Sequence, residues 1–266
     1  MDIRTGRPVT LATQGIVTSP HSLASSAGVD VLRAGGSAID AAIAAAAVLS
    51  VVYPHMTGLG GDAFWLIHEG GSGEVKYLGG GGKAAATASI VALKARGLDE
   101  IPLRGIVPAT LTVPGAVASW IEAHDAYGCL PLKRVFDSAI CYARDGFPVT
   151  ARLASFVEMM RDDLLAQRDA AALFFPDGSV PHAGSKLTNP DLARTLRAMV
   201  AAEKKALASG ASRQGAIDAV RDYFYRGEIA KKIDAFSKAN GGLLRYEDMA
   251  AFKLTPEEPL STTFHG

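Results

Sequence analysis

Two clusters of glycine are the residues of this sequence best suited to chemistry. The first is Gly58-Leu59-Gly60-Gly61-Asp62, and the second is the run Gly79-Gly80-Gly81-Gly82, which Lys83 follows. Successive glycines allow several backbone N–H groups to point into one concavity, where they bind an anion or stabilise an oxyanion. A tight turn between packed elements also favours glycine, so both interpretations stay open for each cluster.

Neither cluster fits a nucleotide-binding motif. A P-loop requires G-x-x-x-x-G-K-[ST], and when Gly82-Lys83 is placed on the G-K, the first glycine falls on Tyr77 and the last position on Ala84. The dinucleotide pattern G-x-G-x-x-G fails at Ala63, and it would follow a predicted helix where a strand is required. The sequence therefore argues against a nucleotide cofactor.

The other reactive side chains form no recognised catalytic or metal-binding pattern. The six histidines are scattered without ligand spacing, and no G-x-S-x-G motif occurs. Cys129 and Cys141 are the only cysteines, which excludes a disulfide framework. We expect two buried, reduced thiols, and we predict neither a metal ion nor a cofactor.

The composition indicates a soluble protein with a substantial core. Of the 266 residues, 48% are hydrophobic, and 27 basic residues balance 27 acidic ones. With zero net charge and no basic run, nothing suggests a nucleic-acid partner. The strongest apolar run, residues 41–52, is too short to span a bilayer, and no apolar segment follows the polar first residues. We therefore expect a cytoplasmic protein with no membrane partner.

A helix pair and a hairpin must position the first glycine cluster. Residues 22–33 have helical spacing and end at Gly35-Gly36, while Ser37 and Asp40 form a capping-box start for a second helix. That second helix is apolar on every face, which predicts burial on all sides. Residues 63–68 and 74–78 are predicted strands of a hairpin, with the two helices packed under the sheet.

The rest of the chain is predicted to be mainly helical. The expected helices are residues 116–127, 132–144, 152–167, 191–209, 213–225, 228–240 and 246–252. We expect one domain, in which residues 1–115 supply the helix pair and the hairpin and residues 116–266 form the mainly helical part.

In their order along the chain, these segments resemble the γ-glutamyltranspeptidase family. The similar segments are residues 16–21, 32–42, 51–55, 58–64, 113–117, 143–147, 224–230, 240–243 and 247–249. Each segment is short, but their common order over about 240 residues makes the resemblance specific.

The resemblance implies an α+β fold of the N-terminal-nucleophile hydrolase type, an α/β/β/α sandwich of which this chain forms an incomplete part. Family members are precursors that cut themselves and expose an N-terminal Thr on a small subunit, and its hydroxyl attacks a γ-glutamyl amide. We therefore expect a γ-glutamyltransferase or amidohydrolase acting on an amide such as glutathione. Its expected partner is the small catalytic subunit from the same precursor.

The pair Thr262-Thr263 is a tempting nucleophile, because the cleavage site of the family begins with a Thr pair. Only three residues follow it, however, whereas such a nucleophile needs a core strand after it. By the resemblance, residues 258–261 match a segment upstream of the cleavage site. We therefore expect no catalytic residue in this chain and no activity from it alone.

The resemblance also implies an Arg just after the second hairpin strand, where it binds the substrate carboxylate as a bidentate pair. That position falls at about Gly79, and the nearest cation is Lys83, which offers a point charge instead of a fork. The candidate substrate-binding residues are Gly79, Gly80, Lys83 and, as a weaker substitute, Arg104. This difference leaves open an oxamate-type or acylase-type amidohydrolase, and a binding or scaffold protein is the alternative of another class.

Overall fold

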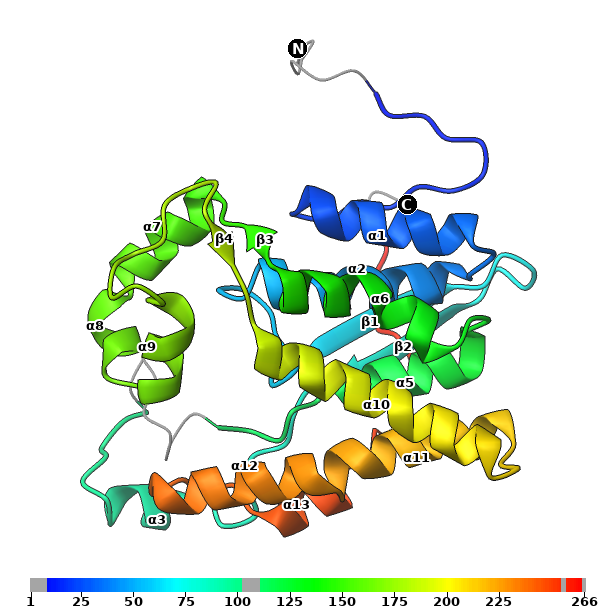
Figure 1. Ribbon diagram of the computed structural model, residues 1–266. Helices are drawn as coiled ribbons and strands as arrows, with labels where there is room; N and C mark the ends of the chain where they lie inside the picture. The colour runs from blue at the N-terminus through cyan, green and yellow to red at the C-terminus, as the bar shows by residue number, and fades with distance from the viewer. Residues whose placement is uncertain (1–8, 102–110, 255–256, 265–266) are drawn as a thin grey trace.

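The computed structural model describes residues 9–101, 111–254 and 257–264 (Figure 1). In chain order the elements are α1 (Ser22–Arg33), α2 (Ala38–Val52), β1 (Ala63–His68), β2 (Val75–Gly80), α3 (Ile90–Lys94), α5 (Ala116–Tyr127), α6 (Leu132–Asp145), β3 (Phe147–Pro148), α7 (Ala151–Met159), α8 (Arg161–Leu165), α9 (Arg168–Phe174), β4 (Lys186–Leu187), α10 (Pro190–Ala208), α11 (Arg213–Tyr225), α12 (Glu228–Ala239) and α13 (Tyr246–Ala251). The predicted α+β class is confirmed. None of the helices in these ranges combines the length and apolar character that crossing a membrane requires.

The helix pair α1 and α2 forms as its sequence signals predict. Gly35 follows α1 with a φ of 86°, in the left-handed region that favours glycine. The Ser37 hydroxyl accepts a hydrogen bond from Asp40 N at 3.1 Å, and the Asp40 carboxylate accepts one from Ser37 N at 2.9 Å. After Ala38, every residue of α2 is buried or half-buried, because its alanine-rich surface lets α1, α5 and α6 pack against it.

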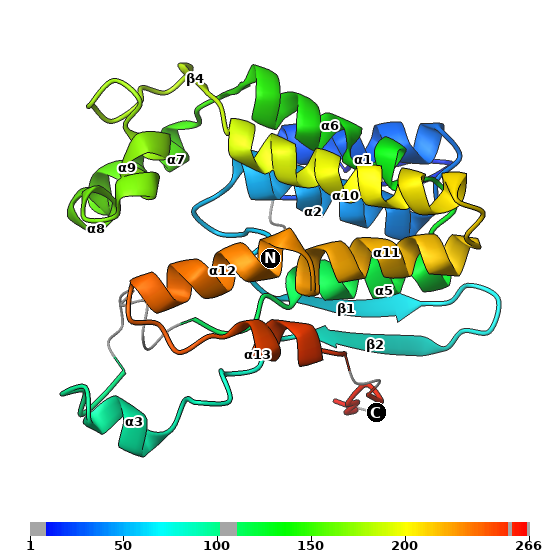
Figure 2. The same ribbon diagram turned by 60° about the horizontal axis from the view of Figure 1, so that its bottom comes forward.

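Strands β1 and β2 form an antiparallel hairpin that starts with the pair Ala63–Gly80 and ends with the pair His68–Val75. One face of the hairpin rests on α5, and α5 packs against α2, so α5 separates the sheet from the first helix pair (Figure 2). On the opposite face, Phe64 and Leu66 are 65% and 72% exposed. We call this exposed side the outer face of the hairpin.

The second half of the chain packs helix against helix. Helix α6 lies between α2 and α10, and α10 packs on α11. The predicted helix 152–167 is interrupted at Met160, where φ is −102° and ψ is 16°, so it forms α7 and α8. Helices α7, α8 and α9 stand apart from the other helices in both views (Figures 1 and 2). One contact that joins them to the core is the ring of Phe156, 5.1 Å from the ring of His55.

The prediction of two buried thiols is wrong. Cys129 and Cys141 are both free, as expected, but both are exposed. Cys129 lies in the connection between α5 and α6, and Cys141 lies on the outward side of α6, where its thiol contacts the Asp145 carboxylate at 3.5 Å. The amphipathic pattern of α6 turns other side chains, such as Phe136 and Ala139, to the core.

Candidate functional site

The two glycine clusters meet at one end of the hairpin, where a third segment joins them. The Asp62 carboxylate accepts a hydrogen bond from Gly82 N at 2.9 Å, which ties the first cluster to the second. The carbonyl oxygen of Gly61 accepts from Gly115 N at 3.0 Å and from Ala116 N at 2.8 Å, at the start of α5. We call residues 58–62, 79–83 and 112–116 together the glycine junction.

Contacts between the second and third segments complete the glycine junction. Val113 N donates to the carbonyl oxygen of Lys83 at 2.9 Å, and Ala84 pairs with Thr112 in an isolated antiparallel bridge. Because these two segments run so close together, a Cβ added at Gly82 would lie 1.7 Å from the carbonyl oxygen of Val113. The third segment is therefore as much a part of the site as the two glycine clusters.

The glycines of the second cluster differ in the space around them. A Cβ at Gly80 would lie 2.4 Å from the carbonyl oxygen of Ala63, which leaves no room for a side chain. At Gly79 the nearest atoms belong to the side chain of Tyr77, at 3.1 Å, and at Gly81 they belong to Phe64, at 3.4 Å. Close packing against backbone atoms therefore explains Gly80 and Gly82, whereas the nearest neighbours of Gly79 and Gly81 are side chains.

Two side chains, one buried and one half-buried, hold the start of α5 in place. The hydroxyl of Tyr225 donates to the carbonyl oxygen of Pro114 at 2.6 Å and accepts from Ala118 N at 2.8 Å. Burial raises the pKa of Tyr225, so this hydroxyl keeps its proton. Trp65 of β1 donates its indole N–H to the Ser119 hydroxyl at 3.0 Å, which connects the hairpin to the same helix.

The structure brings three of the four predicted substrate-binding residues to the glycine junction. Gly79 is half-buried, Gly80 is buried, and Lys83 is exposed. Arg104 lies outside the described residues. The bond between Asp62 and Gly82 and the contacts of the third segment were not predicted from the sequence, although the Pro114-Gly115 dipeptide before a helix is a signal that could have pointed to that segment.

The C-terminal segment pairs with the edge of β2 that faces away from β1 and borders the outer face of the hairpin. Glu257 forms an antiparallel bridge with Tyr77, and residues 257–260 border a hollow that Phe64 and Leu66 also line. Thr262 and Thr263 are both exposed in this segment. Within the described ranges, no three side chains of His, Cys, Asp or Glu come together to hold a metal ion.

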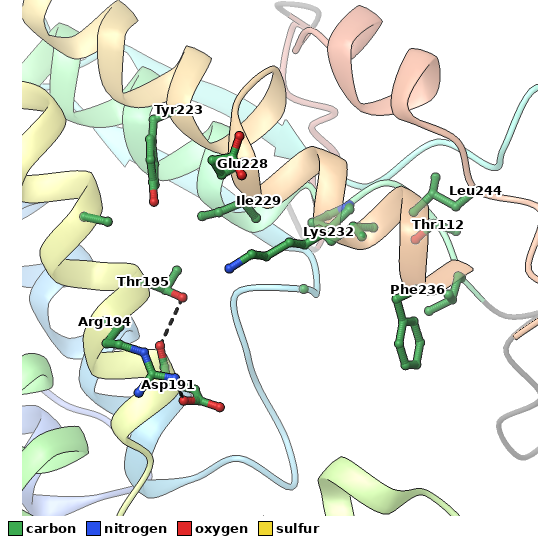
Figure 3. A pocket seen from close by; sticks show the side chains of 15 residues that line it. Thr112, Asp191, Arg194, Thr195, Tyr223, Glu228, Ile229, Lys232, Phe236 and Leu244 are labelled. Carbon is green, nitrogen blue, oxygen red and sulfur yellow. Dashed lines mark hydrogen bonds and ion pairs between the residues drawn. The ribbon is translucent and has the colours of Figure 1, made fainter. Parts of the chain in front are cut away.

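A cavity of about 660 Å³ adjoins the glycine junction (Figure 3). Helix α10 forms one wall, α12 and the end of α11 form another, and Gly60, Thr112 and Pro114 contribute the edge that belongs to the junction. Apart from this edge, the cavity is separate from the two glycine clusters.

Comparison with known proteins now assigns the chain to a family. The model of the gamma-glutamyltranspeptidase family matches residues 24–266, a range that includes the whole glycine junction. The chain belongs to the γ-glutamyltranspeptidase family. The resemblance inferred from the order of short segments is thereby confirmed.

Two relatives in this family share 37% of their aligned residues with the chain over 256 residues. They are the glutathione hydrolase-like YwrD proenzyme of Bacillus subtilis, matched over 96% of this chain and 45% of the relative, and the oxamate amidohydrolase proenzyme of Klebsiella pneumoniae, matched over 94% and 44%. The chain thus spans less than half the length of these relatives. Both names describe precursors, in keeping with a family of processed proenzymes.

Solved structures of the family share the fold. The γ-glutamyltranspeptidase of Helicobacter pylori matches with a TM-score of 0.83 at 30% identity, over 97% of this chain and 70% of that one. A cephalosporin acylase from Bacillus halodurans matches with a TM-score of 0.79 at 33% identity, over 100% of this chain and 48% of that one. The predicted N-terminal-nucleophile hydrolase fold is confirmed.

Proposed function

We propose that the complete protein is an amidohydrolase or acyltransferase that cleaves a γ-glutamyl amide or a similar carboxylate-bearing amide. Its nucleophile is an N-terminal Thr on a small subunit that lies outside this chain and comes from the same precursor. Membership of the γ-glutamyltranspeptidase family and the proenzyme names of the relatives support this proposal. A cytoplasmic location belongs to the same proposal.

The observation that carries the proposal is the outer face of the hairpin. Phe64 and Leu66 expose 65% and 72% of their surface on this face, and Gly79 of the glycine junction pairs with Phe64 near its end. Covering such side chains stabilises a protein by about 25 cal/mol for each Å² removed from water. A small subunit whose sheet packs on this face would bury them and bring its Thr toward Gly79.

The residues at the glycine junction favour some classes of substrate over others. Because Gly79 has no side chain, this position lacks the two parallel N–H donors that the guanidinium of an Arg would offer to a substrate carboxylate. Lys83 is exposed nearby and supplies a single positive charge. This difference favours a smaller carboxylate-bearing amide as the alternative substrate, and the similarity to an oxamate amidohydrolase and to an acylase supports it.

One experiment separates an enzyme from an inactive scaffold. The complete precursor is expressed, its self-cleavage is followed by mass spectrometry, and hydrolysis of glutathione and of oxamate is measured in parallel. We expect two fragments, the second starting with Thr, and we expect replacement of that Thr by Ala to abolish cleavage and hydrolysis together. A precursor that stays intact and still turns over either amide contradicts the proposed mechanism, and one that does neither is a scaffold.

A further inference from the structure

The cavity between α10 and α12 contains two donor groups for which the described residues provide no partner. Lys232 of α12 extends its ammonium group across the cavity toward Thr195 of α10 (Figure 3). The hydroxyl of Tyr223, at the end of α11, points into the same space (Figure 3). Neither group has a hydrogen bond or ion pair with another residue of the described ranges, so both are available to a ligand.

The charges around the cavity leave one positive charge unbalanced. Arg194 is paired with Asp191 on α10, and Glu228 is bonded to Lys231 at 3.2 Å. These two pairs neutralise both carboxylates that line the cavity. Lys232 is then the charge that a ligand meets, and it favours a ligand with a single negative charge.

The remaining surface of the cavity is suited to an apolar group. Ile229, Ile233 and Phe236 of α12 line it, and Phe236 is 44% exposed although it is a large apolar side chain. A ligand lying against these side chains would remove apolar surface from water. The volume of about 660 Å³ is within the range of about 300 to 1,000 Å³ that is typical of small-molecule sites.

We propose that this cavity binds a small monocarboxylate with an apolar body, whose carboxylate contacts Lys232 and Tyr223 and whose body lies against Ile229, Ile233 and Phe236. The ammonium group and the hydroxyl both donate to the carboxylate, and such charge-assisted bonds are stronger than neutral ones. The proposal concerns binding only, and it does not rest on the proposed amide cleavage.

Three probes test whether the ligand needs both a carboxylate charge and an apolar body. Binding of 3-phenylpropionate, its neutral amide 3-phenylpropionamide, and acetate to the complete protein is measured by isothermal titration calorimetry. We expect 3-phenylpropionate to bind with a Kd of about 1 mM or tighter, and each of the other two to bind about tenfold more weakly. Absence of saturable binding, or equal affinity for acid and amide, overturns the proposal.

A second lysine of α12 provides a matched control for the position of the site. Lys232→Gln removes the charge in the cavity, whereas Lys238→Gln removes an equal charge on the same helix, where Lys238 is 57% exposed and bonded to Asp234, a residue that does not line the cavity. We expect Lys232→Gln to weaken binding about tenfold, Lys232→Arg to restore most of it, and Lys238→Gln to change it less than about twofold. Equal effects of the two Gln variants would show a non-specific attraction, and no effect of Lys232→Gln would place the ligand elsewhere. Either result overturns the proposal.

Discussion

The carboxylate of Asp62 lies 2.9 Å from the backbone nitrogen of Gly82, so the residue that ends the first glycine cluster fixes the residue that ends the second. Twenty residues and the whole β1–β2 hairpin separate them in the sequence. The hydrogen bond thereby closes the base of the hairpin at the glycine junction.

Replacing Asp62 tests whether this closure matters for function. Asp62→Ala leaves Gly82 N without its acceptor, and we expect a loss of stability of about 1 kcal/mol or less, because the bond is exposed to solvent. Self-cleavage of the complete precursor should slow more clearly, since the segments around Gly79 lose their relative position. Asp62→Asn retains an acceptor oxygen and serves as the control. Equal cleavage rates in all three proteins would show that the bond has no functional role.

A second prediction compares adjacent glycines of the second cluster. An Ala at position 82 would place its Cβ 1.7 Å from the carbonyl oxygen of Val113, and backbone atoms there cannot move aside without breaking the junction. We expect Gly82→Ala to lower the free energy of unfolding by about 2 to 3 kcal/mol in urea titrations. Gly81→Ala meets only Phe64 at 3.4 Å and should change it by less than about 0.5 kcal/mol. Similar losses in both variants would contradict this account.

The elements that the sequence predicts best are those with local end signals. The predicted bounds of α1, β1, α5 and α11 agree with the structure. Helix α1 ends at Gly35, and Ser212 caps the start of α11 by accepting from Gly215 N at 3.1 Å. Such signals lie within a few residues of the helix end, so a single sequence contains them.

Features that depend on distant contacts were not predicted. Strands β3 and β4 have two residues each, and they exist because Phe147 pairs with Leu187, some forty residues later. The helix under the hairpin is α5 in place of the first helix pair, and the junction needs Asp62 to meet Gly82. None of these contacts between distant residues leaves a periodic pattern in a short stretch of the sequence.

Tyr225 gives a third prediction, on the stability of the glycine junction. Tyr225→Phe keeps the buried ring but leaves the carbonyl oxygen of Pro114 and the N–H of Ala118 without their partner. We expect a loss of about 2 kcal/mol in the free energy of unfolding, measured with urea. Tyr246→Phe is the matched control, because its hydroxyl donates to the carbonyl oxygen of Arg226 at an exposed position and its loss should cost less than about 0.5 kcal/mol. An equally large loss of unfolding free energy in Tyr246→Phe would mean that burial of the hydrogen bonds does not explain the effect of Tyr225→Phe.

The last prediction concerns pH and the buried carboxylate of Glu203, which accepts from Leu132 N, at the start of α6, at 3.0 Å. Burial raises the pKa of Glu203 above its ordinary value of 4.5, although the Leu132 N–H and the charges of His124 and Arg213 oppose the change. The folded protein therefore binds this proton more tightly than the unfolded chain. Stability from this group is highest below pH 4.5 and decreases as the pH rises from 4.5 to the pKa of the folded state.

Glu203→Gln removes that titration and keeps an acceptor for Leu132 N. The stability of this variant relative to the wild type should therefore increase as the pH rises from 4 to 8, measured by urea unfolding at each pH. Glu158→Gln provides the opposite case, because the hydrogen bond from Arg161 lowers the pKa of the exposed Glu158. Its wild-type carboxylate contributes stability above pH 4.5 that disappears in acid, so that variant should lose relative stability as the pH rises. A flat profile for Glu203→Gln, or the same sign for both variants, would show that burial of Glu203 does not control its proton.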